Sequence, residues 1–445
     1  MTGKLTEFML PALVANKILN KRVGSSNFIA DYPTNTEPLL AHVHSTLRSR
    51  TILNDHKDTQ KYKIFVSTWN VGGVAPDEGV KMEDLLETCN NSCDIYVLGF
   101  QEIVPLKASN VLGYEKSKMC SKWNSMIREA LNKKTHIDRD LKDEKKKSWC
   151  NEEENDNPGQ KKCEAPQDFE CIISKQMVGI MISVWAKRHL RPFIQHPSVS
   201  CVGCGIMGCL GNKGSVSVRF VLHETSFCFV CGHLASGGRE GDERHRNSNV
   251  SEIFSRTSFP KGPLLDLPTK ILDHDHTILL GDLNYRISLP EETTRLLVEN
   301  EDWDSLLEHD QLMMEVMSGK MLKGWHEGTI KFAPTYKYCP NSDLYYGCCY
   351  HCKKAAKKRA PAWCDRIIWL GKGLKQIEYG RSESKLSDHR PVRALFMAEV
   401  KVSAALKSFE SLFLSERFEQ IKTHFHEVSL THDAFVSKKQ PSFRL

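Results

Sequence analysis

Apolar and polar positions alternate regularly only after the first 60 residues. β-Branched and aromatic runs at 62–70 and 94–102 each end in polar residues, and a helical pattern at 81–90 lies between them. Runs of this length and composition predict buried strands, so this part of the chain reads as strand, helix, strand. The preceding extension, residues 1–60, predicts little regular structure beyond a short helix near 13–21.

Strand patterns return further along and continue toward the C-terminal region. They occupy residues 169–187, 214–222, 227–235, 276–284, 366–372 and 391–400. Helical spacing of apolar residues is found at 120–133 and over the longer block 291–319. The strict alternation at 214–222 is typical of a strand with one buried face. Together these elements predict an α/β (α+β) fold of two mixed β-sheets packed face to face with helices outside, in one large domain over residues 61–402.

Two segments lie outside this pattern. Residues 133–168 are almost purely charged, which predicts a disordered insert within the domain. For the basic residues of this insert, a solvated loop is favoured over contact with acidic lipid. Residues 403–445 form a C-terminal tail to which the pattern assigns no role.

The composition is that of an ordinary globular protein. The 445 residues are 40% hydrophobic and 26% charged, and the net charge of +6 is compatible with anionic ligands without choosing among them. No segment approaches the roughly 18–20 apolar residues that span a bilayer, and no signal peptide is recognisable. We therefore expect a cytoplasmic protein, and peripheral contact with a membrane stays open.

Sixteen cysteines raise the question of disulfides or zinc. One cluster comprises Cys201, Cys204 and Cys209, and a second comprises Cys339, Cys348, Cys349, His351 and Cys352. Neither cluster has two CxxC pairs at the spacing of a zinc finger. In a long chain of a reducing compartment, free thiols are favoured over structural zinc and over disulfides.

Polar side chains gather where the predicted strands begin or end. They are Asn70, Gln101, Glu102, His233, Asp282, Asn284, Arg286, Asp365, Arg366, Asp388 and His389. Converging strand ends are where α/β folds carry their sites. Asp282 and Asn284 follow the apolar run of "TILLGDLNYRI" two positions apart, so an extended chain would point both to one face. A turn is the equal alternative, because Gly-Asp and Asn favour turns for local reasons.

The chemistry of this set is that of a hard metal and a phosphate. Carboxylates with amide and imidazole partners, and no cysteine, suit Mg²⁺. Such a set can hydrolyse a phosphoester, since a carboxylate orients and deprotonates water while an imidazolium or amide stabilises the transition state. The stretch "GNKGS" lacks the spacing of a P-loop, which argues against a nucleotide site of that kind.

Nine stretches carry a resemblance to a known family. They are "FVSTWNVGG", "LGFQEIVPL", "GNKGSVSVRF", "GHLASGG", "ERHRNSNV", "LLGDLNYRI", "GTIKFAPTYKY", "KKRAPAWCDRIIW" and "SDHRPV". The chain resembles the Mg²⁺-dependent inositol polyphosphate 5-phosphatases of the exonuclease–endonuclease–phosphatase superfamily, and "VANKILNKRVGSSNFIADYP" resembles their plant members. The resemblance implies a DNase I-like four-layer sandwich and phosphoric monoester hydrolysis, with a role in phosphoinositide signalling.

The resemblance also implies how the metal and the water are held. Glu102 would be the direct metal ligand, with Asn70 and Asp388 supporting the metal sphere. Asp282 would position and deprotonate the attacking water. Asn284 would hold that water and the scissile phosphate.

Phosphate recognition is implied for a further group of residues. His389 resembles a phosphate-contacting histidine that pairs with the aspartate matched by Asp365, and His233 would contact the scissile phosphate from the other side. The neighbouring 4-phosphate would be bound by Tyr336, Lys337, Lys357 and Arg359. Fixed cations and a hydroxyl donor are what a ring phosphate beside the reacting one requires. For Lys357 and Arg359, a solvated basic patch is the alternative.

The substrate and the partners are only partly specified. Soluble inositol 1,4,5-trisphosphate and membrane phosphatidylinositol 4,5-bisphosphate remain open, as does the oligomeric state. The chain departs from the plant pattern at Cys204 and Cys209, where an arginine and an aromatic residue are usual. That departure leaves the implied catalytic set intact.

Three other functions compete with this reading. A superfamily nuclease or abasic-site endonuclease would share the catalytic set, but a reader of duplex DNA needs an extended basic face, so no nucleic-acid partner is expected. A sphingomyelinase-like phosphodiesterase is disfavoured for the same reason. A catalytically dead phosphoinositide-binding module would have no use for a water-activating carboxylate such as Asp282.

Overall fold

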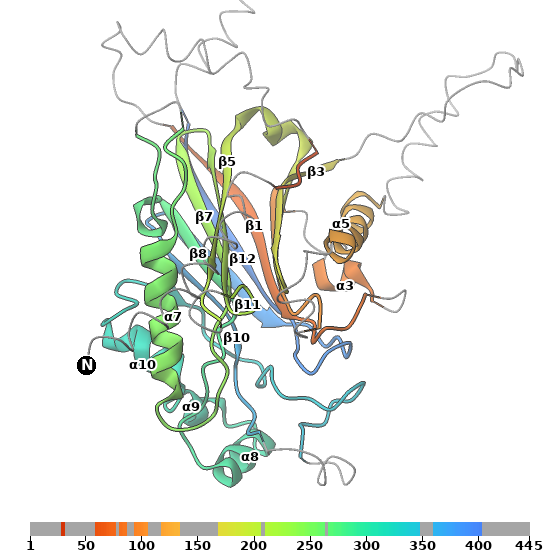
Figure 1. Ribbon diagram of the computed structural model, residues 1–445, viewed down its shortest axis with the longest axis vertical. Coiled ribbons are helices and arrows are strands. Elements are labelled where there is room, and N and C mark those ends of the chain that lie inside the picture. The colour runs from red at the N-terminus through yellow and green to blue at the C-terminus, as the bar shows by residue number, and fades with distance from the viewer. Residues whose placement is uncertain are drawn as a thin grey trace, which may run out of the picture.

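Two six-stranded β-sheets stack face to face in the computed structural model, with helices on both outer sides (Figure 1). The structure describes residues 28–31, 58–76, 80–86, 93–105, 117–133, 168–205, 210–262, 266–347 and 359–402. The predicted fold class, two mixed sheets enclosed by helices, is confirmed. The predicted helix near 13–21, all but the two end residues of the predicted insert at 133–168, and the tail at 403–445 lie outside the described residues.

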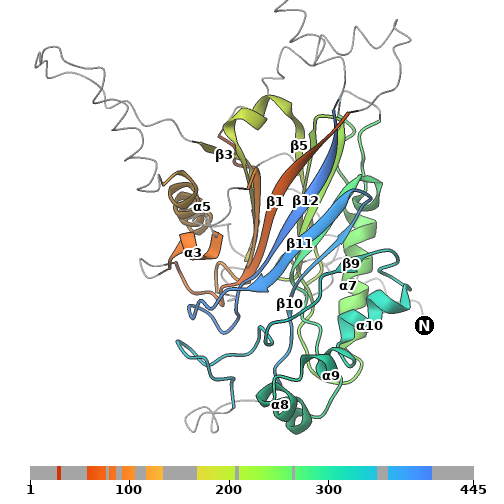
Figure 2. The same ribbon diagram turned by 180° about the vertical axis from the view of Figure 1, so that it is seen from behind.

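The first sheet has the strand order β11-β12-β1-β2-β4-β3. Its strands are β1 (Asp58–Asn70), β2 (Ile95–Gln101), β3 (Phe169–Met177), β4 (Ile180–Lys187), β11 (Leu374–Arg381) and β12 (Val392–Val402). β1 and β2 run parallel, and the other neighbours are antiparallel. Figure 2 shows β1, β12 and β11 side by side toward one edge of this sheet.

The second sheet has the order β5-β6-β7-β8-β10-β9. Its strands are β5 (Ile194–Gly203), β6 (Gly214–Leu222), β7 (Thr225–His233), β8 (His276–Asp282), β9 (His326–Glu327) and β10 (Asp365–Leu370). Here β7 and β8 form the parallel pair. Each sheet therefore mixes parallel and antiparallel neighbours.

Helices cover the outer face of each sheet. α3 (Met82–Leu86) and α5 (Ser117–Asn132) lie on the first sheet, whereas α7 (Asp242–Arg256) and α10 (Gln311–Ser318) lie on the second (Figure 1). α8 (Glu291–Glu299) and α9 (Trp303–Leu307) follow β8, and two short 3-10 helices span Arg188–Phe193 and Ile271–Asp273. Among the described residues, no helix is long and apolar enough to cross a membrane.

The two-residue period of the strands determines which side chains reach the centre of the molecule. In β1, Ile64 and Val66 pack into the core between the sheets, whereas Phe65 and Trp69 pack on the helix side. Successive side chains of a strand point to opposite faces, so Asn70 continues the row of Ile64 and Val66. The row that faces the other sheet thus turns polar at the strand's C-terminal end.

Gly281 is required by the close approach of two parallel strands. Its φ is +151°, and a Cβ at this position would lie 2.0 Å from the carbonyl oxygen of Gly232 on β7. Any side chain would push β8 away from β7. The glycine before Asp282 therefore lets that carboxylate sit directly beside the end of β7.

Most predicted elements are confirmed, and four helices or strands of the described residues are additional. The strand predicted at 214–222 coincides with β6, and the helical block at 291–319 divides into α8, α9 and α10. α7, β5, β9 and β11 were not predicted. Residues 28–31 also pair with the edge of the first sheet, where Ile29 and Ser174 exchange two backbone hydrogen bonds of 2.9 and 2.8 Å.

Candidate active site

Strand ends from both sheets bring four of the predicted residues together. On the second sheet, His233 of β7 and Asp365 of β10 lie in register with Asp282 on either side of β8. Asn70 reaches across from the first sheet, and its Nδ2 donates a hydrogen bond of 2.9 Å to Oδ2 of Asp282. Asp282 is therefore the meeting point of the two sheets. It is 2% exposed.

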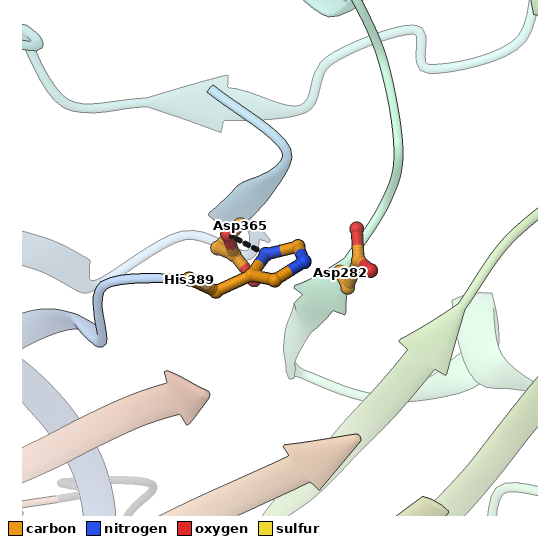
Figure 3. A group of neighbouring side chains, drawn as sticks. All are labelled: Asp282, Asp365 and His389. Atoms are coloured by element: carbon orange, nitrogen blue, oxygen red, sulfur yellow. Dashed lines mark hydrogen bonds and ion pairs between the residues drawn. The ribbon is translucent and has the colours of Figure 1, made fainter. Parts of the chain in front are cut away.

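His389 lies between two buried carboxylates (Figure 3). Its Nδ1 is 2.8 Å from Oδ2 of Asp365, and the same oxygen accepts a 2.7 Å hydrogen bond from the hydroxyl of Thr335. Ligand-type atoms of His389, Asp365 and Asp282 all lie within 4.8 Å of one another. The imidazole is thus oriented by Asp365 while its other edge faces Asp282.

The charges of this cluster support one another. Burial would lower the pKa of His389, but the charge of Asp365 and its hydrogen bond outweigh burial and raise the pKa to about 9. Burial would likewise raise the pKa of Asp282, but the hydrogen bond from His233 and the charge of His389 hold it well below its usual range. At neutral pH the site therefore contains an imidazolium beside an ionised, water-excluded carboxylate.

Lys213 and His233 line the other side of Asp282. Nε2 of His233 is 3.3 Å from Oδ2 of Asp282 and 3.8 Å from Oε1 of Glu102, and it also contacts Nζ of Lys213. Burial and the neighbouring Lys213 cation lower the pKa of His233, which keeps this imidazole neutral. Burial also lowers the pKa of Lys213, and the charges of Asp282 and Glu102 oppose that shift.

Asn284 reaches the site through a turn, not through an extended chain. Its φ is +58°, in the left-handed region, and its backbone N–H donates a 3.2 Å hydrogen bond to Oδ1 of Asp282. The expectation of an extended chain past Gly281 was therefore wrong, and the turn alternative is correct. Short polar residues tolerate this backbone conformation and bond locally to it. The turn holds both Asp282 and Asn284 buried at the strand end.

Glu102, Asp388 and Lys337 form a more accessible rim. Their side chains are 26%, 28% and 27% exposed, respectively. Nζ of Lys337 donates a 2.6 Å hydrogen bond to Oδ2 of Asp388. The amide oxygen of Asn70 accepts a hydrogen bond from the N–H of Gly72, and a Cβ on Gly72 would lie 3.2 Å from Oδ1 of Asp388. Carboxylate and amide oxygens are thus grouped beside the buried cluster.

Two of the other predicted phosphate-binding residues are described by the structure. The ring of Tyr336 lies 4.6 Å from that of His389, which puts it at the cluster. Arg359 lies beside the loop after β7, because a Cβ on Gly238 would be 3.5 Å from its guanidinium. Lys357 lies outside the described residues.

Two polar residues at strand ends bond to residues that support the fold and do not belong to the cluster. Arg366, next to Asp365 on a strand, is fully buried in ion pairs of 2.8 Å with Asp310 and 2.5 Å with Glu327. Gln101 bonds to Thr68 at 3.1 Å within the space between the sheets. In the second cysteine-bearing region, Cys339 is buried and its thiol donates a 3.8 Å hydrogen bond to the carbonyl of Tyr345, and the rest of that cluster lies outside the described residues.

The donor chemistry discriminates between two metal positions. The cluster of Asp282, Asp365 and His389 is compact enough for an ion, but Nδ1 of its imidazole is already engaged with Asp365 at 2.8 Å. A hard cation such as Mg²⁺ also prefers oxygen donors to imidazole nitrogen. The oxygen donors of Glu102 and Asp388, which are partly exposed, fit a hard cation better.

Sequence reasoning missed three residues that touch this set. Lys213 was quoted only within a family motif, although it contacts His233. Thr335 precedes the motif residues Tyr336 and Lys337 and was not considered, and Arg286 was noted without a role. A lysine in a glycine-flanked turn just before a strand was the available signal for Lys213.

The fold and the cluster define a protein of the endonuclease, exonuclease and phosphatase class. The model of Endonuclease/Exonuclease/phosphatase family 2 matches residues 67–395. The inositol polyphosphate 5-phosphatase domain of SPsynaptojanin, solved with inositol (1,4)-bisphosphate and a calcium ion, superposes with a TM-score of 0.62 at 29% identity. That alignment covers 88% of this chain and 99% of the solved chain.

Two plant relatives narrow the class. Type IV inositol polyphosphate 5-phosphatase 9 of Arabidopsis thaliana is 62% identical over 418 residues, which is 93% of this chain and 96% of the relative. Type I inositol polyphosphate 5-phosphatase 8 of the same plant is 46% identical, covering 88% of this chain and 86% of the relative. The chain belongs to the inositol polyphosphate 5-phosphatases and is an enzyme of that family.

Proposed function

We propose that this enzyme uses Mg²⁺ to remove the 5-phosphate from inositol 1,4,5-trisphosphate, phosphatidylinositol 4,5-bisphosphate or both, by direct attack of water, in phosphoinositide signalling. The observation that carries the proposal is the environment of Asp282. This ionised carboxylate is buried between Asn70 and His233 and faces the His389 imidazolium. A buried base beside a fixed cation is what attack of water on a phosphoester needs.

Asp282 and Asn284 act on the attacking water. The low pKa of Asp282 means that its carboxylate is free to accept a hydrogen bond from water throughout the neutral range. It orients the water and takes its proton as the water oxygen bonds to phosphorus. The bond between phosphorus and the 5-oxygen of the inositol ring breaks in the same step, and the departing 5-oxygen takes up a proton from solvent. Asn284 lies two residues after Asp282, and the hydrogen bond from its backbone N–H to Asp282 holds it there. Its side-chain amide would form hydrogen bonds with the water and with the scissile phosphate.

His389 and His233 act on the phosphate from two sides. The His389 imidazolium, fixed by Asp365, neutralises charge that develops on the phosphate oxygens. His233 remains neutral and contributes a hydrogen bond instead of a charge. Lys213 adds a cation on that same side.

Glu102 would hold the Mg²⁺ ion, with Asn70 and Asp388 supporting its sphere. When bound, the ion supplies neutralisation of charge on the phosphate oxygens. The three residues come from neighbouring strand ends, and their oxygens suit a hard cation that keeps several waters. The calcium ion in the SPsynaptojanin complex supports a metal in this family's site.

The ring phosphate beside the reacting one would be bound by Tyr336, Lys337, Lys357 and Arg359. Tyr336 lies against His389, so a phosphate held there would neighbour the one being cleaved. Lys337 pairs with Asp388 in this structure and would exchange that partner for phosphate. A phosphoinositide substrate would bring the enzyme into peripheral contact with a membrane.

Release of inorganic phosphate tests the proposal. We expect Mg²⁺-dependent release from soluble inositol 1,4,5-trisphosphate, from vesicles containing phosphatidylinositol 4,5-bisphosphate, or from both, and the ratio of rates identifies the substrate class. Chelation of the metal should abolish release. No release from either substrate, with cleavage of abasic DNA instead, would assign the chain to nuclease chemistry.

Replacement of Asp282 separates catalysis from binding. Asp282→Ala should lower kcat by about 10²–10⁴-fold, the usual contribution of a general base, while the Kd for inositol 1,4,5-trisphosphate changes little. Isothermal titration calorimetry measures that Kd without turnover. A variant with wild-type kcat would overturn the assignment of the base.

A further inference from the structure

Arg286 lies between the two halves of the proposed site. Its guanidinium donates a 2.8 Å hydrogen bond to Oδ1 of Asn284 and lies 4.5 Å from the centre of the Tyr336 ring. The residue is only 9% exposed. Asn284 belongs to the side that handles water and the scissile phosphate, and Tyr336 to the side that binds the neighbouring phosphate. Arg286 therefore contacts one residue of the water-binding side of the site and one residue of the side that binds the neighbouring phosphate.

The contact with Asn284 fixes the direction of its amide. Oδ1 of Asn284 accepts from Arg286, and Nδ2 donates a 3.2 Å hydrogen bond to the carbonyl of Leu234. A primary amide can rotate by half a turn at little steric cost, so only its partners determine which end faces which group. A guanidinium can only donate hydrogen bonds. It therefore stabilises the orientation in which the amide oxygen of Asn284 faces it, and disfavours the orientation in which the amide nitrogen does.

The contact with Tyr336 is a cation over the face of an aromatic ring. Such contacts strengthen as water is excluded, and here Arg286 is buried while Tyr336 is partly exposed. The ring of Tyr336 also touches His389, so a shift of the ring would disturb both the guanidinium and the imidazolium. A planar guanidinium can bond to the amide at its edge while it stacks on the ring, which a lysine ammonium cannot do.

The backbone of Arg286 is anchored independently of these contacts. Its N–H donates to Oε1 of Gln311 and its carbonyl accepts from the N–H of Gln311, both at 2.9 Å. The same Oε1 accepts a 2.6 Å hydrogen bond from the buried Arg246 of α7. The start of α10 and the side of α7 therefore hold Arg286 in place. Because the backbone of Arg286 is fixed, a displacement of the Tyr336 ring moves the guanidinium relative to Asn284 and does not move the whole residue.

We propose that Arg286 is a positioning residue that couples occupancy of the neighbouring-phosphate site at Tyr336 to the catalytic orientation of Asn284. This inference rests on the proposed function and deepens it. Phosphate binding at Tyr336 fixes the ring, the ring fixes the guanidinium, and the guanidinium fixes the amide. The neighbouring phosphate thus contributes to kcat as well as to binding.

Two substrates that differ only in the neighbouring phosphate test the coupling. For the wild-type enzyme, inositol 1,4,5-trisphosphate should have both a higher kcat and a lower KM than inositol 1,5-bisphosphate. In Arg286→Lys, the advantage in kcat should fall at least fivefold while the advantage in KM persists through Lys337 and Arg359. An unchanged ratio of kcat values would overturn the proposal.

Arg366→Lys is the matched control, since Arg366 is also a buried arginine, 0% exposed against 9% for Arg286, and it pairs with Asp310 and Glu327 instead of the cluster. It should lower the melting temperature as much as Arg286→Lys or more, yet leave the ratio of kcat values for the two substrates unchanged. A loss of that ratio in both variants would mean that Arg286 acts only through stability, which also overturns the proposal.

A double-mutant cycle in binding separates this inference from the proposed function. Kd values for inositol 1,4,5-trisphosphate are measured for Asn284→Ala, Tyr336→Leu and the double variant, with Arg286 and with Arg286→Met. The effects should be non-additive by threefold or more with arginine and additive with methionine. Binding without hydrolysis would refute the proposed function, but the double-mutant cycle could still be interpreted because it uses only Kd values. Additivity in both backgrounds would refute the coupling alone.

Discussion

At the scale of single residues, the arrangement around His389 links protonation to catalysis. Asp365 is the group that keeps the buried imidazole charged, and Thr335 holds Asp365 by a 2.7 Å hydrogen bond. Without an opposite charge, burial would favour the neutral imidazole. The proposed phosphate contact by a cation therefore depends on a carboxylate that does not touch the substrate.

The pH dependence of the reaction should report this pair. His389, with a pKa of about 9, is charged below that pH and loses its proton above it, so kcat/KM should decline as pH rises through about 9. In Asp365→Asn the largest raising charge is gone while those of Asp282 and Asp388 remain, so the decline should move to a lower pH than in the wild-type enzyme. Steady-state kinetics from pH 5 to 10 measures the alkaline decline of kcat/KM in the wild-type enzyme and in Asp365→Asn.

Thr335→Val is the control for that experiment. It removes a hydrogen bond to Asp365 but keeps the carboxylate charge, so its alkaline limb should remain close to that of the wild-type enzyme. If kcat/KM of Asp365→Asn declined at the same alkaline pH as that of the wild-type enzyme, the decline would report the titration of a group other than His389.

The composition of the site could be predicted from the sequence much better than its internal contacts. The carboxylates, amides and imidazoles at the strand ends were all named, and Asn70, His233, Asp282, Asp365 and His389 do converge. Lys213 was missed because a lysine in a turn is ordinarily solvated. Its contact with His233 exists only through the pairing of β6 with β7.

At the scale of elements, helix α7 shows why a pattern of apolar residues can fail. Its buried positions include Arg246 and Asn249 together with Val250 and Ile253. Two of these four are polar, so the sequence lacks the apolar stripe from which helices are predicted. The polar pair is buried because it bonds to the site loops, Arg246 to Gly237 and Asn249 to Ala235.

Strand β5 was missed for a different reason. It contains Pro197, and its register with β6 shifts between Gln195 and Ser198. Proline and irregular pairing are tolerated at the edge of a sheet, where β5 lies. A local pattern cannot reveal that a segment is an edge strand, because that position depends on the rest of the sheet.

Residues 28–31 close the other edge of the fold. Asp31 accepts a 2.7 Å hydrogen bond from the N–H of Cys171 on β3, and its second oxygen pairs with Arg128 of α5. Arg128 in turn lies 5.0 Å from the centre of the Trp185 ring. This short segment therefore joins the edge strand to the helix that covers the sheet, and it blunts an edge that could otherwise pair with another chain.

Replacement of Asp31 tests how much this contact stabilises the fold. Asp31→Ala leaves the N–H of Cys171 without its carboxylate acceptor and should lower the free energy of unfolding by about 1–2 kcal/mol. Urea denaturation measures the change. Lys61→Ala, which removes an exposed ion pair of 3.7 Å with Glu399, should cost about 0.5 kcal/mol or less. If the two variants lost the same free energy of unfolding, the contact of Asp31 with β3 would stabilise the fold no more than an exposed ion pair does.

At the scale of the whole molecule, the site lies where the row of side chains between the sheets turns polar. Asn70 continues the row of Ile64 and Val66, and Asp282 continues that of Ile278 and Leu280. Both sheets must be assembled and correctly stacked before these side chains meet. The sequence could predict the polar strand ends, but the order of the strands and the stacking of the sheets come from long-range packing.

A metal bound at this junction should therefore stabilise the entire fold. A ligand that binds only the folded state at 100 times its Kd adds about 2.7 kcal/mol to the free energy of unfolding. Saturating Mg²⁺ should raise the melting temperature of the wild-type protein by several degrees, and a chelator should reverse the rise. Differential scanning calorimetry with and without Mg²⁺ measures the shift independently of activity.

Glu102→Gln should lose most of that shift, because Glu102 is the proposed direct ligand and its side chain is 26% exposed beside Asp282 and His233. Asp266→Asn, at an exposed position remote in sequence from the site residues, should keep the full shift. If Glu102→Gln retained the wild-type shift, the stabilising ion would bind elsewhere. If neither variant nor the wild-type protein responded to Mg²⁺, the oxygen cluster at the junction of the sheets would select a different cation.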